Sequence, residues 1–398
     1  MRTGKTILYI SYDGMTDPLG RGQVLSYLEG LSAYYKILLI SCEKKEPFRK
    51  YEKTIREICE EKSIEWYPVN YTKSPPVLSG LYDIRKIRKL ARKLFRKQHF
   101  SLVHCRSYMA SLVGLYLQKK YRVKFIFDMR GFWVDEKIEN TWDRKNPVYR
   151  FVIRYFRKKE KLFYEKADAI VTLTESARKV VVDKDLSNPE KINVVPTCVN
   201  LHRFQRFDLQ KRLEIRKKLG IPEKAFVLLY SGGYGPNYDT AFVLTVYNRV
   251  KKIFPDACLL ILSKDGVTGL EKNNDTGNLF TISLPYAEVG DHLMAGDLGL
   301  INYAHGFSVA GRSPTKLGEY WATGLAGIAP PGIGDVDSLF TKFKNSGIIY
   351  NETTFENDLE KVQATPKEIL RGYAETYFSL EKGVELYRGI YNKLLMNE

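Results

Sequence analysis

The stretch 313–329 carries residue types that could hold an anionic ligand at the start of a helix. Ser313 is a favourable helix N-cap and Pro314 suits a first helical turn, so we expect a helix that begins here and ends at Gly324. An apolar run then enters a strand. The N-terminus of such a helix presents free N–H groups and a partial positive charge, and both favour an anion in front of it.

The side chains at the start of this helix fit a nucleotide sugar. Lys316 lies in the first turn beside Thr315, where a cation is unfavourable unless a phosphate shares the space. Glu319 follows one turn later on roughly the same face, and its carboxylate could accept hydrogen bonds from two vicinal hydroxyls. The alternative is an ordinary capped surface helix, because short motifs match by chance. The residues predicted to bind the donor here are Ser313, Pro314, Thr315, Lys316 and Glu319.

Two glycine-containing loops occupy equivalent places, each after the first predicted strand of one half of the chain. Glycine allows a ligand to approach the backbone closely, as phosphate-binding loops require. The alternative is a turn that only needs a positive φ angle. The residues predicted to contribute to donor binding are Gly20, Arg21 and Gly22 in the first half, and Ser231, Gly232 and Gly233 in the second.

Asp128 ends a predicted strand and is followed by Arg130 and Trp133. A carboxylate at the end of a strand could orient a sugar hydroxyl or an acceptor, and an aromatic face could stack on a sugar ring. We therefore predict a catalytic role for Asp128, with Arg130 and Trp133 at the acceptor or in its loop. The alternative is an Asp128–Arg130 ion pair that only fixes the loop.

The sequence shows no metal site or separate cofactor site. The five histidines lack zinc-ligand spacing, the five cysteines form no CxxC pair, and no acidic pair indicates a metal bound to a diphosphate. We expect free thiols in a reducing compartment, no metal and no cofactor, with the nucleotide sugar as a substrate.

The net charge of +17 is confined to one half of the chain. Residues 1–200 hold 40 Lys and Arg against 23 Asp and Glu, so the whole excess lies there. Its densest runs, 83–100 and 149–166, combine basic side chains with apolar ones at helical spacing. Such helices can lie on anionic lipid, or can pack on a sheet with a solvated basic face. We expect packing for the apolar stripe and an anionic membrane surface, not nucleic acid, as the partner of the basic face.

Strand-like apolar runs alternate with helical patterns along both halves, which predicts an α/β fold of two tandem Rossmann-like domains. The predicted domains are 1–199 plus 377–398, and 200–376, with ligands in a cleft between them beyond the carboxyl ends of the strands. The predicted strands are 6–12, 35–42, 64–69, 102–106, 124–128, 169–174 and 192–195, then 226–231, 257–263, 279–284, 297–302 and 327–329.

Five ordered landmarks resemble those of the bacterial retaining glycosyltransferases of family four, which have the GT-B fold. They are 17–28, 127–136, 166–174, 194–204 and 313–324, and they extend over nearly the whole chain. The resemblance implies a nucleotide-sugar donor in the C-terminal domain, an acceptor in the N-terminal domain and no metal. It also implies a terminal helix, 377–395, that returns to the first domain.

The resemblance also implies roles for single residues. Glu319 matches the glutamate that holds the donor ribose, while Lys316 and Thr315 match the stretch that meets the diphosphate. Asp128 stands where many members have a histidine beside the reacting centre. The chain departs from the family at Gly311, where members commonly have a glutamate that contacts the transferred sugar, and this departure leaves the sugar identity open.

Together these features predict a cytoplasmic glycosyltransferase, peripheral on the inner face of the cell membrane. It would move a sugar, with retention, from a nucleotide diphosphate to a glycan or lipid-linked acceptor in bacterial surface polysaccharide or glycolipid synthesis. Lys316 and the helix N-terminus would stabilise the departing diphosphate, which makes Lys316 catalytic. The alternatives are a nucleotide-sugar epimerase of similar fold and a catalytically impaired relative that binds polyanions.

Overall fold

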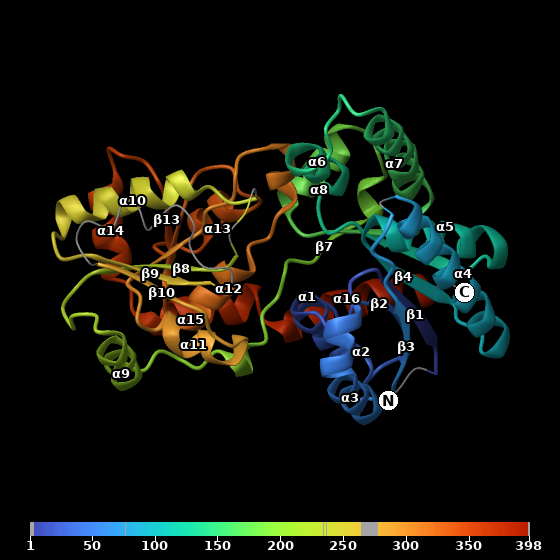
Figure 1. Cartoon of the computed structure of the whole chain (residues 1–398), viewed down its shortest axis with the longest axis horizontal. Coiled ribbons are helices and arrows are strands. Elements are labelled where there is room, and N and C mark those ends of the chain that lie inside the picture. The colour runs from blue at the N-terminus through green and yellow to red at the C-terminus, as the bar shows by residue number, and fades with distance from the viewer. Residues whose placement is uncertain (1–3, 76, 234, 236, 264–277, 397–398) are drawn as a thin grey trace. The chain divides into compact units, whose positions relative to one another are not determined.

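The computed structural model describes residues 4–75, 77–233, 235, 237–263 and 278–396. The chain forms two compact units, drawn in Figure 1: Met1–Pro196 with Leu380–Glu398, and Thr197–Ser379. Their boundaries lie three residues from the predicted ones at 199 and 376. Each unit is built on its own parallel β-sheet.

The first unit has a parallel sheet in the strand order β3-β2-β1-β4-β5-β6-β7. Its central strands are apolar runs that are buried almost throughout, as parallel strands covered on both faces must be. The strands are β1 (Thr6–Ser11), β2 (Lys36–Glu43), β3 (Ile64–Asn70), β4 (Leu102–Arg106), β5 (Lys124–Asp128), β6 (Ala169–Thr172) and β7 (Ile192–Val194).

The helices of the first unit connect successive strands, and Figure 1 shows α5 between α4 and α7. They are α1 (Pro18–Gly20), continued by a π-helical turn (Arg21–Leu25) and α2 (Ser26–Leu31), then α3 (Lys45–Glu61), α4 (Leu78–Lys97), α5 (Ser107–Tyr121), α6 (Trp133–Asn140), α7 (Pro147–Lys166) and α8 (Glu175–Asp183).

A C-terminal helix, α16 (Leu380–Leu395), belongs to the first unit and packs on α2. A side chain at Gly30 of α2 would collide with Val384, since its Cβ would lie 2.6 Å from Cγ2 of the valine. Tyr35 donates a hydrogen bond to Asn392 of α16 at 2.6 Å. The predicted return of the terminal helix to the first domain is therefore confirmed, although this helix begins at Leu380 rather than at residue 377.

The second unit repeats the design with the strand order β10-β9-β8-β11-β12-β13. Its strands are β8 (Val227–Ser231), β9 (Cys258–Leu262), β10 (Leu279–Ile282), β11 (Leu298–Leu300), β12 (Ala326–Ala329) and β13 (Gly347–Ile349). Its helices are α9 (Leu209–Leu219), α10 (Thr240–Ile253), α11 (Tyr286–Leu293), α12 (Thr315–Ala322), α13 (Val336–Lys342), α14 (Phe355–Gln363) and α15 (Lys367–Tyr377).

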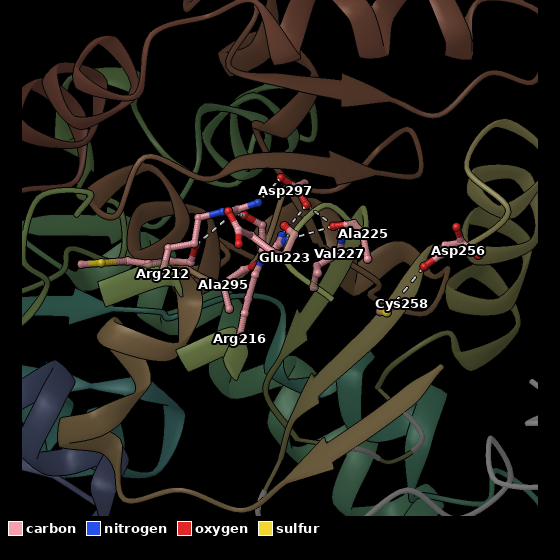
Figure 2. Close-up of polar contacts among 11 residues, drawn as sticks. Arg212, Arg216, Glu223, Ala225, Val227, Asp256, Cys258, Ala295 and Asp297 are labelled. Atoms are coloured by element: carbon pink, nitrogen blue, oxygen red, sulfur yellow. Dashed lines mark hydrogen bonds and ion pairs between the residues drawn. The ribbon is translucent and has the colours of Figure 1, made fainter. Parts of the chain in front are cut away.

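A buried arginine network fixes the amino ends of β8 and β11. Figure 2 shows Asp297 between Arg212 and Arg216 of α9, with N···O distances of 2.6 and 2.7 Å. The same carboxylate accepts a hydrogen bond from the backbone N–H of Val227 at 2.7 Å. Arg216 also donates to the carbonyl oxygens of Glu223, Ala225 and Ala295. Because one end of each strand is held in this way, the loops at the other end start from fixed positions.

The predicted α/β class with two parallel sheets is confirmed, and most strand bounds differ from the prediction by one or two residues. The prediction omitted β13. Helical backbone in the segment of the first glycine residues starts at Pro18, where a loop was predicted. None of the described helices combines the length and apolar character needed to cross a bilayer.

Candidate active site

Lys316 is a buried lysine on the first turn of α12, and the rings of three tyrosines surround it. Its side chain is 7% exposed. Its Nζ lies 4.2, 5.0 and 5.8 Å from the ring centroids of Tyr230, Tyr238 and Tyr303. Among the described residues, no atom accepts a hydrogen bond from this Nζ. The tyrosine faces attract the cation but do not replace the hydrogen bonds that it makes in water.

Burial lowers the pKa of Lys316 to about 7, and the nearby Glu319 carboxylate offsets this only in part. Removal from water disfavours the charged form of a lysine, whereas a neighbouring anion favours it. The ammonium group is therefore close to half protonated near neutral pH. A second anion beside Nζ would hold the proton on Lys316, so the site is poised to bind a negatively charged ligand.

The loop after β8 approaches Lys316 at Gly232. A Cβ atom at this position would lie 3.1 Å from Nζ, and the φ angle of +143° also disfavours other residues. Gly232 donates its N–H to Leu262, and Gly233 accepts a hydrogen bond from the Tyr230 hydroxyl at 2.5 Å. Ser231 donates its N–H to the Tyr320 hydroxyl of α12. The structure thus brings the predicted residues Ser231, Gly232 and Gly233 to the first turns of α12.

Glu319 lies one turn after Lys316 and is equally buried, at 7% exposure. Burial raises the pKa of its carboxyl group, although the hydrogen bond from Tyr286 and the charge of Lys316 act in the other direction. The Tyr286 hydroxyl donates to Oε1 of Glu319 at 2.8 Å. Glu319 therefore carries an accepting oxygen pair whose position is set by α12 and by the first turn of α11.

The start of α12 differs from the prediction. Ser313 is not the N-cap, because its hydroxyl accepts the backbone N–H of Thr197 at 3.0 Å. Pro314 occupies the N-cap position with extended backbone angles, and Thr315 is the first helical residue. Ser313 joins the strand-to-helix loop to the beginning of the unit instead of capping the helix.

The first unit gathers a separate polar cluster at the carboxyl ends of β1, β4 and β5. Arg106, at the end of β4, is 3% exposed and donates to Asp13 at 3.1 Å and to the amide oxygen of Gln23 at 3.1 Å. Arg130 donates to the same Gln23 oxygen at 3.1 Å. Two guanidinium groups therefore meet at one neutral acceptor, with the carboxylates of Asp13 and Asp128 close to them.

Asp128 lies beneath this cluster and is fully buried. Its Oδ2 accepts hydrogen bonds from His104 at 3.3 Å and from Tyr387 of α16 at 3.2 Å. Burial raises the pKa of Asp128, but Arg130 and the His104 hydrogen bond outweigh burial, and the net pKa is lowered. Burial lowers the pKa of His104, so its neutral ring donates to Asp128 and accepts from Tyr391. The structure supports a positioning role for Asp128, and its predicted contact with a reacting sugar stays a prediction.

The first glycine segment is helical and is not the predicted loop, while its predicted contact with the donor stays a prediction. Gly20 and Gly22 belong to the helical segment that starts at Pro18, and neither has a positive φ angle. A Cβ at Gly20 would lie 2.0 Å from the carbonyl oxygen of Gly14, so this glycine lets two backbone segments touch. Arg21 lies over the ring of Tyr51, 4.7 Å from its centroid. The backbone of this segment is therefore occupied by helix formation and does not form a phosphate-binding loop.

Trp133 also has a packing role that was not predicted. Its ring lies against Tyr108, Trp142 and Phe156, with centroid distances of 5.4, 5.3 and 4.9 Å. These contacts join α5, α6 and α7. Since tilted and edge-to-face contacts occupy the indole on several sides, Trp133 stabilises the α6–α7 region, and its predicted stacking on a sugar stays a prediction.

Several residues at these sites were not identified from the sequence. Glu43, at the end of β2, accepts hydrogen bonds from the N–H groups of Met15 and Thr16 and so holds the loop after β1. Tyr230 and Tyr303 end or follow adjacent strands of the second sheet. The sequence offered one signal for these two tyrosines, because each lies at or just after the carboxyl end of a predicted parallel strand, where ligands bind in such sheets. The other residues missed are Tyr238, Tyr286, Arg106, His104 and Asp13.

Sequence comparison finds a family match over most of the first unit. Residues 27–203 match the family described as Glycosyltransferase Family 4. The D-inositol 3-phosphate glycosyltransferase of Kineococcus radiotolerans is 28% identical over 144 residues, which are 35% of this chain and 31% of that protein. The corresponding match to the Nocardioides sp. protein of the same name covers 28% of that protein. The chain thus matches less than a third of the length of either relative.

Solved structures share the fold of the whole chain. Sucrose-phosphate synthase from Thermosynechococcus elongatus has a TM-score of 0.69 at 14% identity, with 99% of this chain and all of that chain covered. Anabaena HepE in complex with UDP and glucose has a TM-score of 0.65 at 13% identity, with 98% of each chain covered. Residues 27–203 are therefore similar to Glycosyltransferase Family 4, and the two parallel α/β units of the chain have the GT-B fold.

Proposed function

We propose that this protein is a metal-independent glycosyltransferase that moves a hexose, with retention, from a nucleotide diphosphate to a glycan or lipid-linked acceptor. The donor would bind in the second unit around Lys316 and Glu319. The acceptor would bind in the first unit near Arg106. We place the enzyme on the cytoplasmic face of a bacterial membrane, where it would take part in surface polysaccharide or glycolipid synthesis.

The observation that carries the proposal is the buried Lys316 ammonium group. A buried charge without a hydrogen-bond acceptor is unfavourable, and a diphosphate beside Nζ would supply one at a charge-assisted distance. Gly232 keeps the space next to Nζ free of a side chain. The first turn of α12 adds the positive end of a helix dipole at the same place. These features support binding of the donor phosphates at this point.

Glu319 supports a nucleoside at the same site. Its carboxylate accepts from Tyr286 through Oε1, and carboxylate oxygens can accept further hydrogen bonds from vicinal hydroxyls. We propose that the ribose hydroxyls take this position. HepE, which shares the fold, was solved with UDP, and UDP is accordingly the first nucleotide to test.

In the first unit, the polar cluster supports an acceptor with oxygen-rich groups. The Arg106 and Arg130 guanidinium groups converge on the neutral Gln23 amide, so these two groups of N–H donors are not both taken up by the nearby carboxylates of Asp13 and Asp128. Such an arrangement favours hydroxyl and anionic acceptor groups. The names of the curated relatives include a phosphate-bearing acceptor, inositol 3-phosphate, which agrees with this chemistry.

The chemistry would depend on stabilising the leaving diphosphate. When the bond between the sugar and the phosphate breaks, negative charge develops on the phosphate oxygens, and Lys316 with the α12 N-terminus would stabilise it. We propose that these groups replace a divalent metal in that role. No carboxylate pair among the described residues is placed for a double displacement, so we propose attack from the face that the diphosphate leaves, which retains the configuration.

Replacing Glu319 with Ala should weaken nucleoside diphosphate binding by about 1–3 kcal/mol, the scale for losing hydrogen bonds to a charged group. Isothermal titration with UDP, GDP and ADP measures the effect on the nucleotide that binds most tightly. Glu288→Ala on the exposed side of α11 is the matched control and should bind like the wild type. Unchanged binding in a folded Glu319→Ala protein would exclude the ribose assignment.

Binding of UDP-glucose should weaken as the pH rises above 7. Free Lys316 has a pKa of about 7, and a bound diphosphate favours its charged form, so binding takes up a proton above that pH. Affinity should be constant below pH 7 and fall by up to about tenfold per pH unit above it. Lys316→Met should bind weakly at every pH.

The matched control for this pH series is Lys342→Met, which removes an exposed lysine that also lies over an aromatic ring. This variant should keep the wild-type pH profile. UDP-glucose has no phosphate group that titrates in this range, so any proton taken up on binding is bound by the protein. A flat wild-type profile would contradict the role of Lys316.

Sugar transfer or slow donor hydrolysis should persist in excess EDTA, because Lys316 and α12 supply the positive charge at the diphosphate. The assay follows release of the free nucleotide from a panel of UDP-, GDP- and ADP-sugars, and proton NMR reports the anomer formed. Full loss of activity with EDTA, restored by Mg²⁺ or Mn²⁺, would disprove the metal-free mechanism.

The basic first unit should bind anionic vesicles at low salt and lose this binding as salt increases. Each Lys or Arg near such a surface contributes about 1 kcal/mol of binding free energy. Salt screens this attraction beyond about a Debye length. Reversing Arg88, Lys89, Arg92 and Lys93 of α4 to Glu should release the protein in co-sedimentation while donor hydrolysis continues. Reversing four exposed lysines of the second unit is the control, namely Lys217, Lys218, Lys224 and Lys252. Wild type that ignores anionic vesicles would exclude the membrane claim.

A further inference from the structure

A groove on the first unit lies along α5, with α4 and α7 as its walls. Figure 1 shows these three helices in succession on one side of the unit. The groove has a volume of about 950 Å³, at the upper end of the range for small-molecule sites. It is lined by none of the residues of the two sites described above. It is therefore a separate feature that the transfer reaction does not explain.

The floor of the groove is apolar and incompletely covered. Leu112 and Leu115 of α5 and Leu162 of α7 are half-buried, although each lies on a helix whose inner face is fully packed on the sheet. Such side chains retain apolar surface in contact with water, which favours an apolar occupant. The apolar lining as a whole consists of Leu81, Ile84, Leu112, Leu115 and Leu162, together with Tyr116 and Tyr155.

The rim of the groove is basic. The charged residues that line it are Arg85, Arg88, Lys119, Lys159 and Lys166, and the described lining includes no carboxylate. Lys166 is paired with Glu165 at 2.6 Å, while Arg88 lies over Tyr116 at 4.4 Å. The described part of the chain offers no ion-pair partner to Arg85 or Lys119. An anionic group at the rim would therefore meet several cations, and the nearby Glu165 carboxylate is already paired with Lys166.

The two wall helices also expose large apolar side chains in their first turns. Leu78 and Tyr82 of α4 are 63% and 57% exposed, and Val148 and Phe151 of α7 are 56% and 68% exposed. Helices that connect parallel strands run antiparallel to them, so both sets lie toward the carboxyl edge of the sheet. The helices that form the groove thus present apolar and basic groups together, as surfaces that contact lipid do.

We propose that this groove binds one anionic phospholipid of the bilayer, with an acyl chain along α5 and the phosphate at Arg85 and Arg88. The half-buried leucines match a hydrocarbon chain, which needs no hydrogen bonds from the floor. The cationic rim matches the headgroup, and Tyr116 can lie at the boundary between chain and headgroup. This binding goes beyond general attraction to a charged surface, because it requires a chain of sufficient length, and it does not rest on the transfer chemistry.

Titration with monomeric alkyl phosphates of eight, ten and twelve carbons, below their micelle concentrations, tests the groove directly. Each two carbons added should tighten binding by about tenfold, given the free energy of burying a methylene group. Inorganic phosphate should bind far more weakly than dodecyl phosphate. Dodecanoyl lysophosphatidylglycerol should bind at least tenfold more tightly than the phosphatidylcholine analogue, since only the former carries a net negative charge. Affinity that does not rise with chain length would overturn the proposal.

Two sets of variants separate groove binding from surface charge. Filling the groove with Leu112→Trp or Leu115→Trp should remove the dependence on chain length while thermal unfolding shows a folded protein. Arg85→Glu with Lys159→Glu should weaken dodecyl phosphate binding at least tenfold. The matched control is Lys89→Glu with Lys93→Glu. It also reverses two charges, but both lie on α4 outside the groove, so it should weaken dodecyl phosphate binding much less than the rim pair does.

The results that would overturn the groove proposal differ from those that would exclude attraction to anionic vesicles. Equal weakening by the rim pair and by the control pair would show that only overall charge matters, and would overturn the groove proposal while leaving vesicle attraction intact. Folded tryptophan variants that keep the chain-length dependence would overturn it as well.

Discussion

The Lys316 ammonium group lies in the interior of the second unit on the faces of three tyrosines, with no hydrogen-bond acceptor among the described residues. A folded protein tolerates such a group only because the aromatic faces recover part of the lost hydration and because the lysine can release its proton. The surrounding structure maintains this position. Gly232 leaves room beside Nζ, and Tyr320 of α12 accepts the N–H of Ser231, so the helix and the β8 loop are held together.

The placement of these groups depends on polar networks at a distance from them. In the second unit, Asp297 holds two arginines of α9 and the first residue of β8, which fixes the strand whose other end carries the glycine loop. In the first unit, α16 holds the carboxyl ends of β4 and β5 through the hydroxyls of Tyr387 and Tyr391. In each unit a carboxylate with several donors, fully buried at Asp128 and half-buried at Asp297, fixes the strands from which the loops of the candidate sites begin. Leaving such a carboxylate without its partners would cost free energy of folding, so the donors around it stay in place.

Periodicity was sufficient to predict the architecture, because buried parallel strands are continuous apolar runs that stand out from amphipathic helices. The strands at 102–106 and 124–128 were predicted to the residue. Short elements were missed: β13 has three residues and α13 has seven, and segments of this length carry too little pattern to be recognised.

The site was harder to predict than the fold, because its geometry comes from contacts between distant residues. The proximity of Glu319 to Lys316 followed from their spacing on one helix. The tyrosines that surround Lys316 come from β8, from the loop before α10 and from the loop after β11, and spacing could not predict that they meet. The error at Gly20 has a similar origin. Its small size serves a contact with Gly14, and a sequence cannot distinguish a glycine that faces a ligand from one that faces another backbone segment.

The two units use positive charge in opposite ways. In the second unit, the buried Lys316 cation has no hydrogen-bond acceptor among the described residues, and its cost in free energy falls when an anion arrives, so its charge acts through desolvation at short range. The first unit has many exposed cations, whose attraction is long-range and screened by salt. A small charged donor suits the buried cation of the second unit. An extended anionic surface suits the exposed cations of the first unit. The apolar floor between Arg85 and Lys159 then adds what charge alone lacks, a site that can distinguish a lipid from any other polyanion.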